Sequence, residues 1–380
     1  MAFRKRNVTV GRSTTDGLPS QIPVQTASGI RPSTLTSQPV TSTGTSSLDA
    51  LLGGHGGLAL GCSLLVEESG TTDFAGAILR YYAAEGMCHG HVIHVVGLSD
   101  SWIRELPGVA EGKASSRREG KVVDEQKMKI AWRYEQLGQA GERAVRDHIP
   151  SSQPATAQPE TQFCHIFDLT KRLTIPHDAS INHIPISPGP APFDTIVRTL
   201  EQRLASSSAN SVHRLVIPTI LSPALYPSQS SRPEIFIRFL HSLRALLRKY
   251  STKLTAMITL PLELYPRGSA LVRWAEIFSD GVLELTPFPH LMDASNSSVE
   301  SGGAKSNEEQ PQGMVKVHKL PINTERGEGG AGAGNSMGED LAFSVSRRKF
   351  VIKPFSLPPL EGDEDAQKEA GKLTGKDVEF

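Results

Sequence analysis

Residues 44–97 constrain the fold more than any other part of this chain. They predict a short capped helix, a glycine-rich turn, an apolar strand over Ser63–Glu67, a second turn, an amphipathic helix and an apolar strand over His91–Val96. Between Phe74 and Tyr82, apolar residues recur with the helical period, which predicts a helix with one face packed on a sheet. The segment therefore has the order of a strand–turn–helix–strand unit in a parallel sheet.

The turn after the first strand has the position of a phosphate-binding loop but lacks the lysine. A P-loop requires G-x-x-x-x-G-K-[ST], in which backbone N–H groups hold phosphate and the lysine reaches the β and γ oxygens. Here the turn reads Glu-Ser-Gly-Thr-Thr-Asp, with threonine in the lysine's place and Asp73 adding negative charge. Gly70, Thr71 and Thr72 are therefore predicted to form a degenerate nucleotide-binding turn.

A second element of nucleotide chemistry is also missing. An ATPase of this kind needs an apolar strand that ends in an aspartate for Mg²⁺. The candidate strand lies within His213–Leu221, and Pro218 and Thr219 stand where the acid would be. The sequence contains no H-E-x-x-H, and its one G-x-S-x-G match, over Gly334–Gly338, lies in a glycine-rich run without the strand and helix of a nucleophile elbow. We therefore predict no catalytic residues, and we interpret Glu67 and Glu68 as solvated acids at a strand end rather than catalytic carboxylates.

Composition narrows the function classes. Forty Lys and Arg balance forty Asp and Glu, so overall charge does not indicate a polyanion partner. Three widely spaced cysteines favour reduced thiols in a cytosolic or nuclear protein. His89, His91 and His94 lie close together, but no Cys or carboxylate pairs with them at metal-ligand spacing, so we expect no metal site. No apolar run reaches the roughly 18–20 residues of a membrane helix.

Strands and helices alternate over residues 45–286, which predicts an α/β fold: a mostly parallel, twisted sheet flanked by helices, with C-terminal β additions. The segments on either side are rich in polar or acidic residues. The predicted organisation is a disordered tail over 1–43, a core over 44–290 with low-complexity insertions near 107–127 and 138–161, a C-terminal β extension over 291–358 with a glycine-rich insertion, and an acidic disordered tail over 359–380.

Several segments in combination resemble one family. Glu67–Phe74, Leu79–Gly86 and Met128–Tyr134 are similar to segments of the PAXNEB family, whose members have a RecA-like ATPase core without the Walker lysine. Phe163–Leu173 and the basic stretch Ser346–Ile352 also fit that family. The resemblance covers about residues 44–358 and implies the same RecA-like P-loop-type core.

The resemblance implies a subunit of the Elongator complex. Family members form a hetero-hexameric ring with Elongator proteins 5 and 6, which docks on the catalytic Elongator subcomplex. The ring binds tRNA and supports a 5-carboxymethyl-type modification of the wobble uridine, in the cytoplasm and nucleus. The expected role is a non-catalytic scaffold without a cofactor, with weak ATP binding at ring interfaces left open. The alternative is a ring ATPase subunit whose site is completed by its neighbours and drives tRNA release.

Ring-forming relatives place two loops in the central pore, which here correspond to Ser222–Pro233 and Pro261–Ser269. Basic residues in these loops and in the C-terminal basic stretch are hypothesised to contact tRNA phosphate. Ordinary solvated surface charge is the alternative for each of them. The candidate tRNA-contacting residues are Arg232, Arg267, Arg347, Arg348 and Lys349.

Overall fold

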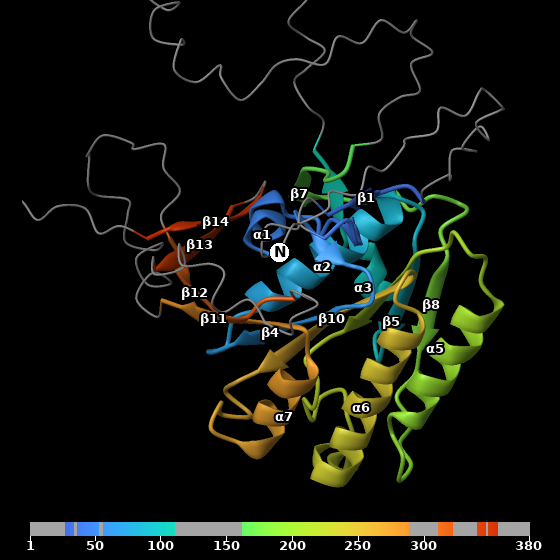
Figure 1. The fold of residues 1–380 in the computed structure, drawn as a ribbon. Coiled ribbons are helices and arrows are strands. Elements are labelled where there is room, and N and C mark those ends of the chain that lie inside the picture. Colours follow the sequence, from blue (N-terminus) through green and yellow to red (C-terminus); the bar gives the residue numbers. More distant parts are fainter. Residues whose placement is uncertain are drawn as a thin grey trace, which may run out of the picture.

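One nine-stranded sheet organises the residues that the structure describes (Figure 1). The computed structural model describes residues 27–33, 36–52, 56–110, 162–288, 311–321, 340–346 and 349–355. The strands of this sheet are β4 (Ser63–Glu68), β5 (Val92–Val96), β8 (Ile181–Ile184), β9 (His213–Ile217), β10 (Leu254–Pro261), β11 (Gly281–Pro287), β12 (Gly313–Lys319), β13 (Leu341–Val345) and β14 (Phe350–Pro354). The helices are α1 (Ser46–Leu51), α2 (Phe74–Cys88), α3 (Asp100–Arg104), α5 (Asp194–Ser206), α6 (Pro233–Lys249) and α7 (Ala270–Phe278).

The strand order is β14-β13-β12-β11-β4-β10-β9-β5-β8. Every neighbouring pair from β11 to β8 is parallel, and β12, β13 and β14 are added antiparallel beyond β11. The predicted α/β fold with a mostly parallel sheet and C-terminal β additions is therefore confirmed. The three antiparallel strands extend the main sheet and do not form a sheet of their own.

Helices cover both faces of the sheet. In Figure 1, α1, α2 and α3 lie on one face, and α5, α6 and α7 lie on the other. Each face has its own apolar core, and β4 contributes to both because its side chains alternate: Leu64 and Val66 face the α2 side, and Leu65 faces the α6 side. Among the described helices, none combines the length and apolar character that crossing a bilayer requires.

The structure corrects the C-terminal part of the predicted disordered tail over 1–43, because residues 27–33 and 36–43 are folded. In this part β1 (Ile30–Pro32) and β2 (Pro39–Thr41) form a small antiparallel sheet with β3 (Leu58–Ala59). Asp49 of α1 accepts hydrogen bonds from Ser42 Oγ at 2.6 Å and from the Thr43 N–H at 2.7 Å, and all three residues are buried. Composition indicated disorder because Ser and Thr bury little apolar surface, but here their polar groups find partners inside the fold.

The first insertion begins later than predicted. β6 (Pro107–Val109) pairs antiparallel with β7 (Phe167–Arg172), so the first residues of the 107–127 insertion belong to the fold. The second predicted insertion, 138–161, the family-like segment Met128–Tyr134 and the acidic tail 359–380 lie outside the described residues.

Arg214 is fully buried in β9 and connects four parts of the fold. Its Nε donates to His91 Nδ1 at 3.0 Å, and its Nη2 donates to Thr41 Oγ1 at 2.6 Å. Its Nη1 donates to the carbonyl oxygens of Ser42 and Tyr82, both at 2.9 Å. The guanidinium also lies 4.7 Å from the centre of the Tyr82 ring. Hydrogen bonding from all three nitrogens, together with the aromatic face, makes burial of this charge tolerable.

Gly86 lies inside α2, which continues to Cys88. A Cβ at Gly86 would lie 2.5 Å from Arg214 Cδ and 2.6 Å from Ile93 Cδ1. The glycine therefore gives the arginine side chain room to pass along the helix, and it does not act as a helix terminator.

We expect Arg214→Met to lower the free energy of unfolding by about 3 kcal/mol, because it leaves the Ser42 carbonyl and His91 Nδ1 buried without their donor. Urea denaturation followed by circular dichroism measures this. Arg203→Met, at an exposed position on α5, is the matched control and should change stability by less than about 0.5 kcal/mol. Equal effects of the two substitutions would contradict a central role for Arg214.

A chain of buried polar side chains crosses the sheet near its β8 edge. Asn182 Nδ2 donates to His94 Nδ1 at 3.0 Å, so the His94 proton lies on Nε2 and is donated to His213 Nδ1 at 2.9 Å. His213 Nε2 then donates to Ser211 Oγ at 3.1 Å. Burial, together with the neighbouring His213, lowers the pKa of His94 to about 3. Burial and the charge of Lys253 lower the pKa of His213 to about 4.

Both histidines are therefore neutral in the folded protein at pH values where the unfolded chain takes up protons. As the pH falls below the ordinary histidine pKa of about 6.5, each histidine should lower the free energy of unfolding by about 1 kcal/mol per pH unit. Above that pKa neither histidine makes the free energy of unfolding depend on pH. Denaturation of the parent and of His94→Gln at pH 7, 6 and 5 measures this slope, which should be shallower in the variant. His177→Gln, at an exposed position, should keep the parent slope.

Candidate functional site

The predicted nucleotide-binding turn lies at the carboxyl end of β4, in the parallel part of the sheet. β4 lies between β10 and β11, and α2 begins directly after the turn. Thr219, which follows β9, lines the same small cavity as Gly70 and Thr72. The two elements that lack their functional residues therefore meet, as parallel strand order requires. Their cavity has a volume of about 50 Å³, whereas ligand pockets typically measure 300–1,000 Å³.

The carboxylate of Glu68 fills the N-terminus of α2. Glu68 Oε1 accepts hydrogen bonds from Thr72 Oγ1 at 2.6 Å and from the Phe74 N–H at 2.9 Å, and Glu68 Oε2 accepts from the Ala75 N–H at 2.9 Å. A helix N-terminus attracts anions because its first N–H groups lack partners within the helix. In this chain a side chain of the preceding strand satisfies them, in the position where a P-loop would hold phosphate.

Other acids close the rest of the turn. The Gly70 N–H donates to Glu263 Oε1 at 2.8 Å, and Gly70 has a positive φ of 88°. Asp73 lies beside the cavity and pairs with Arg80 at 3.0 Å. The carboxyl groups of Glu68, Glu263 and Asp73 thus lie at a turn that contains no lysine, and Arg80 offsets the charge of Asp73.

Thr219 has a strained backbone, with φ of +36°, which is rare for a β-branched residue. Its N–H donates to Thr259 Oγ1 at 2.7 Å, which holds this conformation. Leu221, two residues later, also has a positive φ, of 68°. The backbone after β9 is therefore held in an unusual conformation beside the turn. Thr219 occupies the position where a metal-binding acid would be.

Glu67 and Glu68 are buried, which corrects their interpretation as solvated acids. Neither carboxyl oxygen of Glu67 has a hydrogen-bond partner among the described residues. Burial and the nearby Glu276 carboxylate raise the pKa of Glu67, and the charge of Arg267 lowers it. The net result is a pKa of about 8. Burial also raises the pKa of Glu68 despite its three donors. The sequence placed both acids at the strand end, but their burial depends on the loops that cover them.

The structure separates the candidate tRNA-contacting residues into three groups. Arg232 and Lys349 are exposed. Arg267 pairs with Glu276 at 2.9 Å and with Glu284 at 2.8 Å, so its charge is neutralised within the chain. The remaining two, Arg347 and Arg348, lie outside the described residues.

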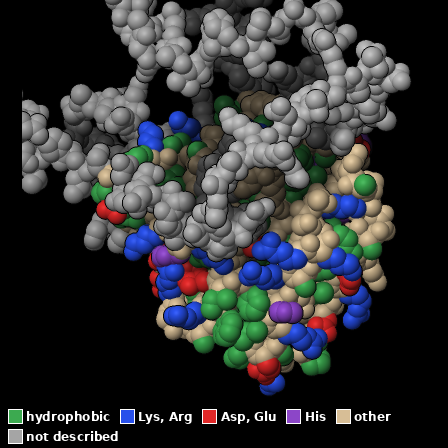
Figure 2. Space-filling view, viewed as in Figure 1, with side chains coloured by type: hydrophobic (Ala, Val, Ile, Leu, Met, Phe, Trp, Pro, Cys, Tyr) green, Lys and Arg blue, Asp and Glu red, His purple; other side chains and the backbone are tan. Residues whose placement is uncertain are grey.

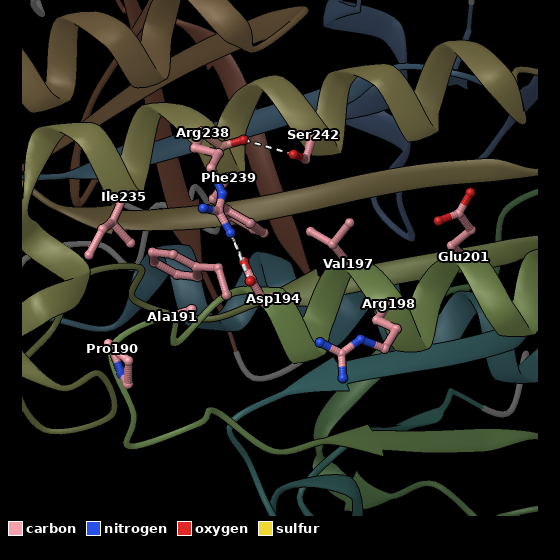
Figure 3. Close-up of a pocket in the computed structure, with 11 residues that line it drawn as sticks. Pro190, Ala191, Asp194, Val197, Arg198, Glu201, Ile235, Arg238, Phe239 and Ser242 are labelled. Atoms are coloured by element: carbon pink, nitrogen blue, oxygen red, sulfur yellow. Dashed lines mark hydrogen bonds and ion pairs between the residues drawn. The ribbon is translucent and has the colours of Figure 1, made fainter.

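Two surface features were not predicted from the sequence. On α7, Trp274 and Ile277 are 40% and 48% exposed, and Figure 2 shows this apolar patch with Lys and Arg side chains around it. Between α5 and α6 lies a groove of about 360 Å³, much larger than the cavity at the turn. Across this groove Arg238 Nη2 donates hydrogen bonds to both carboxylate oxygens of Asp194, at 2.6 and 2.7 Å (Figure 3).

The fold and the turn define a class of protein: an α/β protein with a nucleotide-binding type of strand–turn–helix whose phosphate position is filled by its own carboxylate. Within this class, a family model described as PAXNEB protein matches residues 23–380, so the chain belongs to the PAXNEB family. The resemblance inferred from the residues is thereby confirmed.

Individual relatives agree with this assignment. Elongator complex protein 4 of Schizosaccharomyces pombe is 32% identical, over 92% of this chain and 93% of the relative. The Saccharomyces cerevisiae protein of the same name is 30% identical, over 90% and 78%, and that of Homo sapiens is 25% identical, over 87% and 80%. Among solved structures, a KaiC-like protein of Pyrococcus horikoshii aligns with 83% of this chain and 99% of its own, at 14% identity and a TM-score of 0.40.

Replacing Glu68 should reveal its role at the helix N-terminus. We expect Glu68→Ala to lower the free energy of unfolding by about 1–3 kcal/mol, because the Phe74 and Ala75 N–H groups lose their acceptor. Glu68→Gln keeps one acceptor oxygen and should lose less. Glu263→Gln, which changes an exposed acid of the same site, is the control and should be close to neutral. Equal stability of Glu68→Ala and the parent would show that the carboxylate does not hold the turn.

Proposed function

We propose that this chain is a non-catalytic structural subunit of the Elongator complex. It forms a hetero-hexameric RecA-like ring with Elongator proteins 5 and 6, and the ring docks on the catalytic subcomplex in the cytoplasm and nucleus. The ring binds tRNA and supports modification of the wobble uridine. Membership of the PAXNEB family supports this proposal, because the matched relatives are named Elongator complex protein 4.

The observation that carries the non-catalytic part of the proposal is the Glu68 carboxylate at the start of α2. Phosphoryl transfer depends on positioning and on charge stabilisation by lysine, metal-binding acids and free backbone donors. This turn has no lysine, the N–H groups of Phe74 and Ala75 are already bonded, and Thr219 lies where a metal-binding acid would be. Any ATP chemistry of the ring is therefore assigned to the neighbouring subunits.

The tRNA contact is assigned to the exposed cations. Arg232 precedes α6 in one of the two loops expected to face the pore, and Lys349 lies beside β14. Arg267 is a weaker phosphate ligand because a phosphate would have to compete with Glu276 and Glu284 for its guanidinium.

Reconstitution with Elongator proteins 5 and 6 of the same source organism tests this function. We expect a hetero-hexamer by mass measurement, no ATP turnover by the isolated chain, and a ring turnover that Thr72→Val leaves unchanged. Turnover by the isolated chain, or its loss in an intact Thr72→Val ring, would favour the alternative of an ATPase site completed by neighbours. A stable homo-hexamer of this chain without partners would contradict the proposed ring.

The same ring tests the tRNA contact at fixed salt. Arg232→Glu should weaken tRNA binding, and it should reduce the salt dependence by the amount expected for about one phosphate contact. Arg203→Glu, at an exposed position on α5, is the control for a general change of charge. Equal tRNA affinity of the Arg232→Glu ring and the parent ring would remove Arg232 from the interface.

A further inference from the structure

Three side chains with metal-binding atoms meet near the C-terminal end of α2. Glu85 lies in the last turn of α2 and His89, four residues later, is its C-cap residue, so the two lie on one face of the helix end. His165 comes from the segment that leads into β7. Glu85 Oε1 lies 2.8 Å from His89 Nε2 and 3.0 Å from His165 Nδ1. The four-residue spacing of Glu85 and His89 is visible in the sequence, but His165 lies 80 positions from Glu85 and joins them only in the fold.

The donor set suits a divalent transition metal. Two imidazole nitrogens and one carboxylate oxygen lie within 4.8 Å of one another. Two histidines and one glutamate are a ligand set for Zn²⁺, which is tetrahedral and leaves the fourth position to water when the protein supplies three ligands. Borderline metals such as Zn²⁺ prefer imidazole, whereas Ca²⁺ and Mg²⁺ prefer oxygen ligands alone.

Outer hydrogen bonds hold these groups in place. The other ring nitrogen of His89, Nδ1, lies 3.2 Å from Ser28 Oγ. The His165 backbone N–H donates to Glu85 Oε2 at 3.0 Å, which fixes the plane of the carboxylate. Partners of this kind orient metal-binding histidines and carboxylates in proteins.

Burial and charge also favour a cation at this position. The side chains of Glu85 and His89 are 0% and 2% exposed, whereas that of His165 is 20% exposed and leaves a route from solvent. Among the described residues, the Glu85 carboxylate has no lysine or arginine within ion-pair distance. In the part of the chain that the structure describes, the hydrogen-bond donors to this carboxylate come from His89 and His165 alone.

We propose that Glu85, His89 and His165 bind one Zn²⁺ ion or a similar divalent transition metal, with water as the fourth ligand. The site is structural. It ties α2 to the segment that leads into β7 and, through the hydrogen bond between His89 Nδ1 and Ser28 Oγ, to the N-terminal segment. The metal thereby holds together residues that are far apart in the sequence. Its binding offsets the loss of chain entropy that closing these long loops requires.

The full-length chain, stripped with a chelator and dialysed, tests the proposal. We expect it to take up one Zn²⁺ per chain by calorimetry and mass spectrometry, and Co²⁺ to give the visible d–d absorption of a tetrahedral site. Bound Zn²⁺ should also raise the melting temperature, because it binds only the folded chain. Failure of the parent chain to bind either metal in a saturable 1:1 manner would overturn the proposal.

Variants separate this site from other histidines. His165→Gln and Glu85→Gln should each weaken Zn²⁺ binding at least tenfold. The loss of an outer-shell hydrogen-bond partner already weakens metal binding by about that much, and the loss of a ligand should cost no less. His177→Gln, at an exposed position outside the cluster, should bind like the parent. Circular dichroism identifies any variant that fails to fold, and the other ligand variant then decides. Parent-like affinity in a folded ligand variant would show that the ion binds elsewhere and would overturn the assignment.

Discussion

The buried guanidinium of Arg214 is the interaction on which much of the structure depends. It extends from the middle of the parallel sheet to α2, to the residue before β5 and to the N-terminal segment. A charge in this position is stable only when its donors have partners, so the positions of those partners constrain one another. The absence of a side chain at Gly86 and the folding of the Ser- and Thr-rich segment before α1 both follow from this requirement.

The parallel order of the strands places the degenerate site. Because β9, β10, β4 and β11 are neighbours, the segments that follow them meet at one edge of the sheet. That edge contains Thr219 after β9, Glu263 after β10 and Glu68 at the end of β4. The architecture that normally assembles phosphate ligands here assembles carboxylates, and the N–H groups of Gly70, Phe74 and Ala75 donate to two of them. The site is therefore complete within itself, which is consistent with a structural role for the subunit.

Local patterns in the sequence were enough to predict the elements that bury an apolar face. The helix from Phe74 and the strand from Ser63 are examples, because their periodicity depends only on neighbouring residues. β8 was missed because it is a short, half-buried edge strand without a clear apolar pattern. The N-terminal strands were missed because their burial depends on Arg214, which lies 172 positions from Ser42. At the turn, the missing lysine was visible in the sequence, whereas the direction of the Glu68 side chain was not.

The hydrogen bond between Thr72 and Glu68 limits what a single substitution in this turn could achieve. A lysine introduced into the turn would meet the Glu68 carboxylate first, and the two would form an ion pair inside the protein. Removing Glu68 alone would leave the first N–H groups of α2 without partners and would supply no lysine. Neither substitution alone would give the turn both a lysine and free N–H donors, so phosphate binding here would require changes at positions 68 and 72 together.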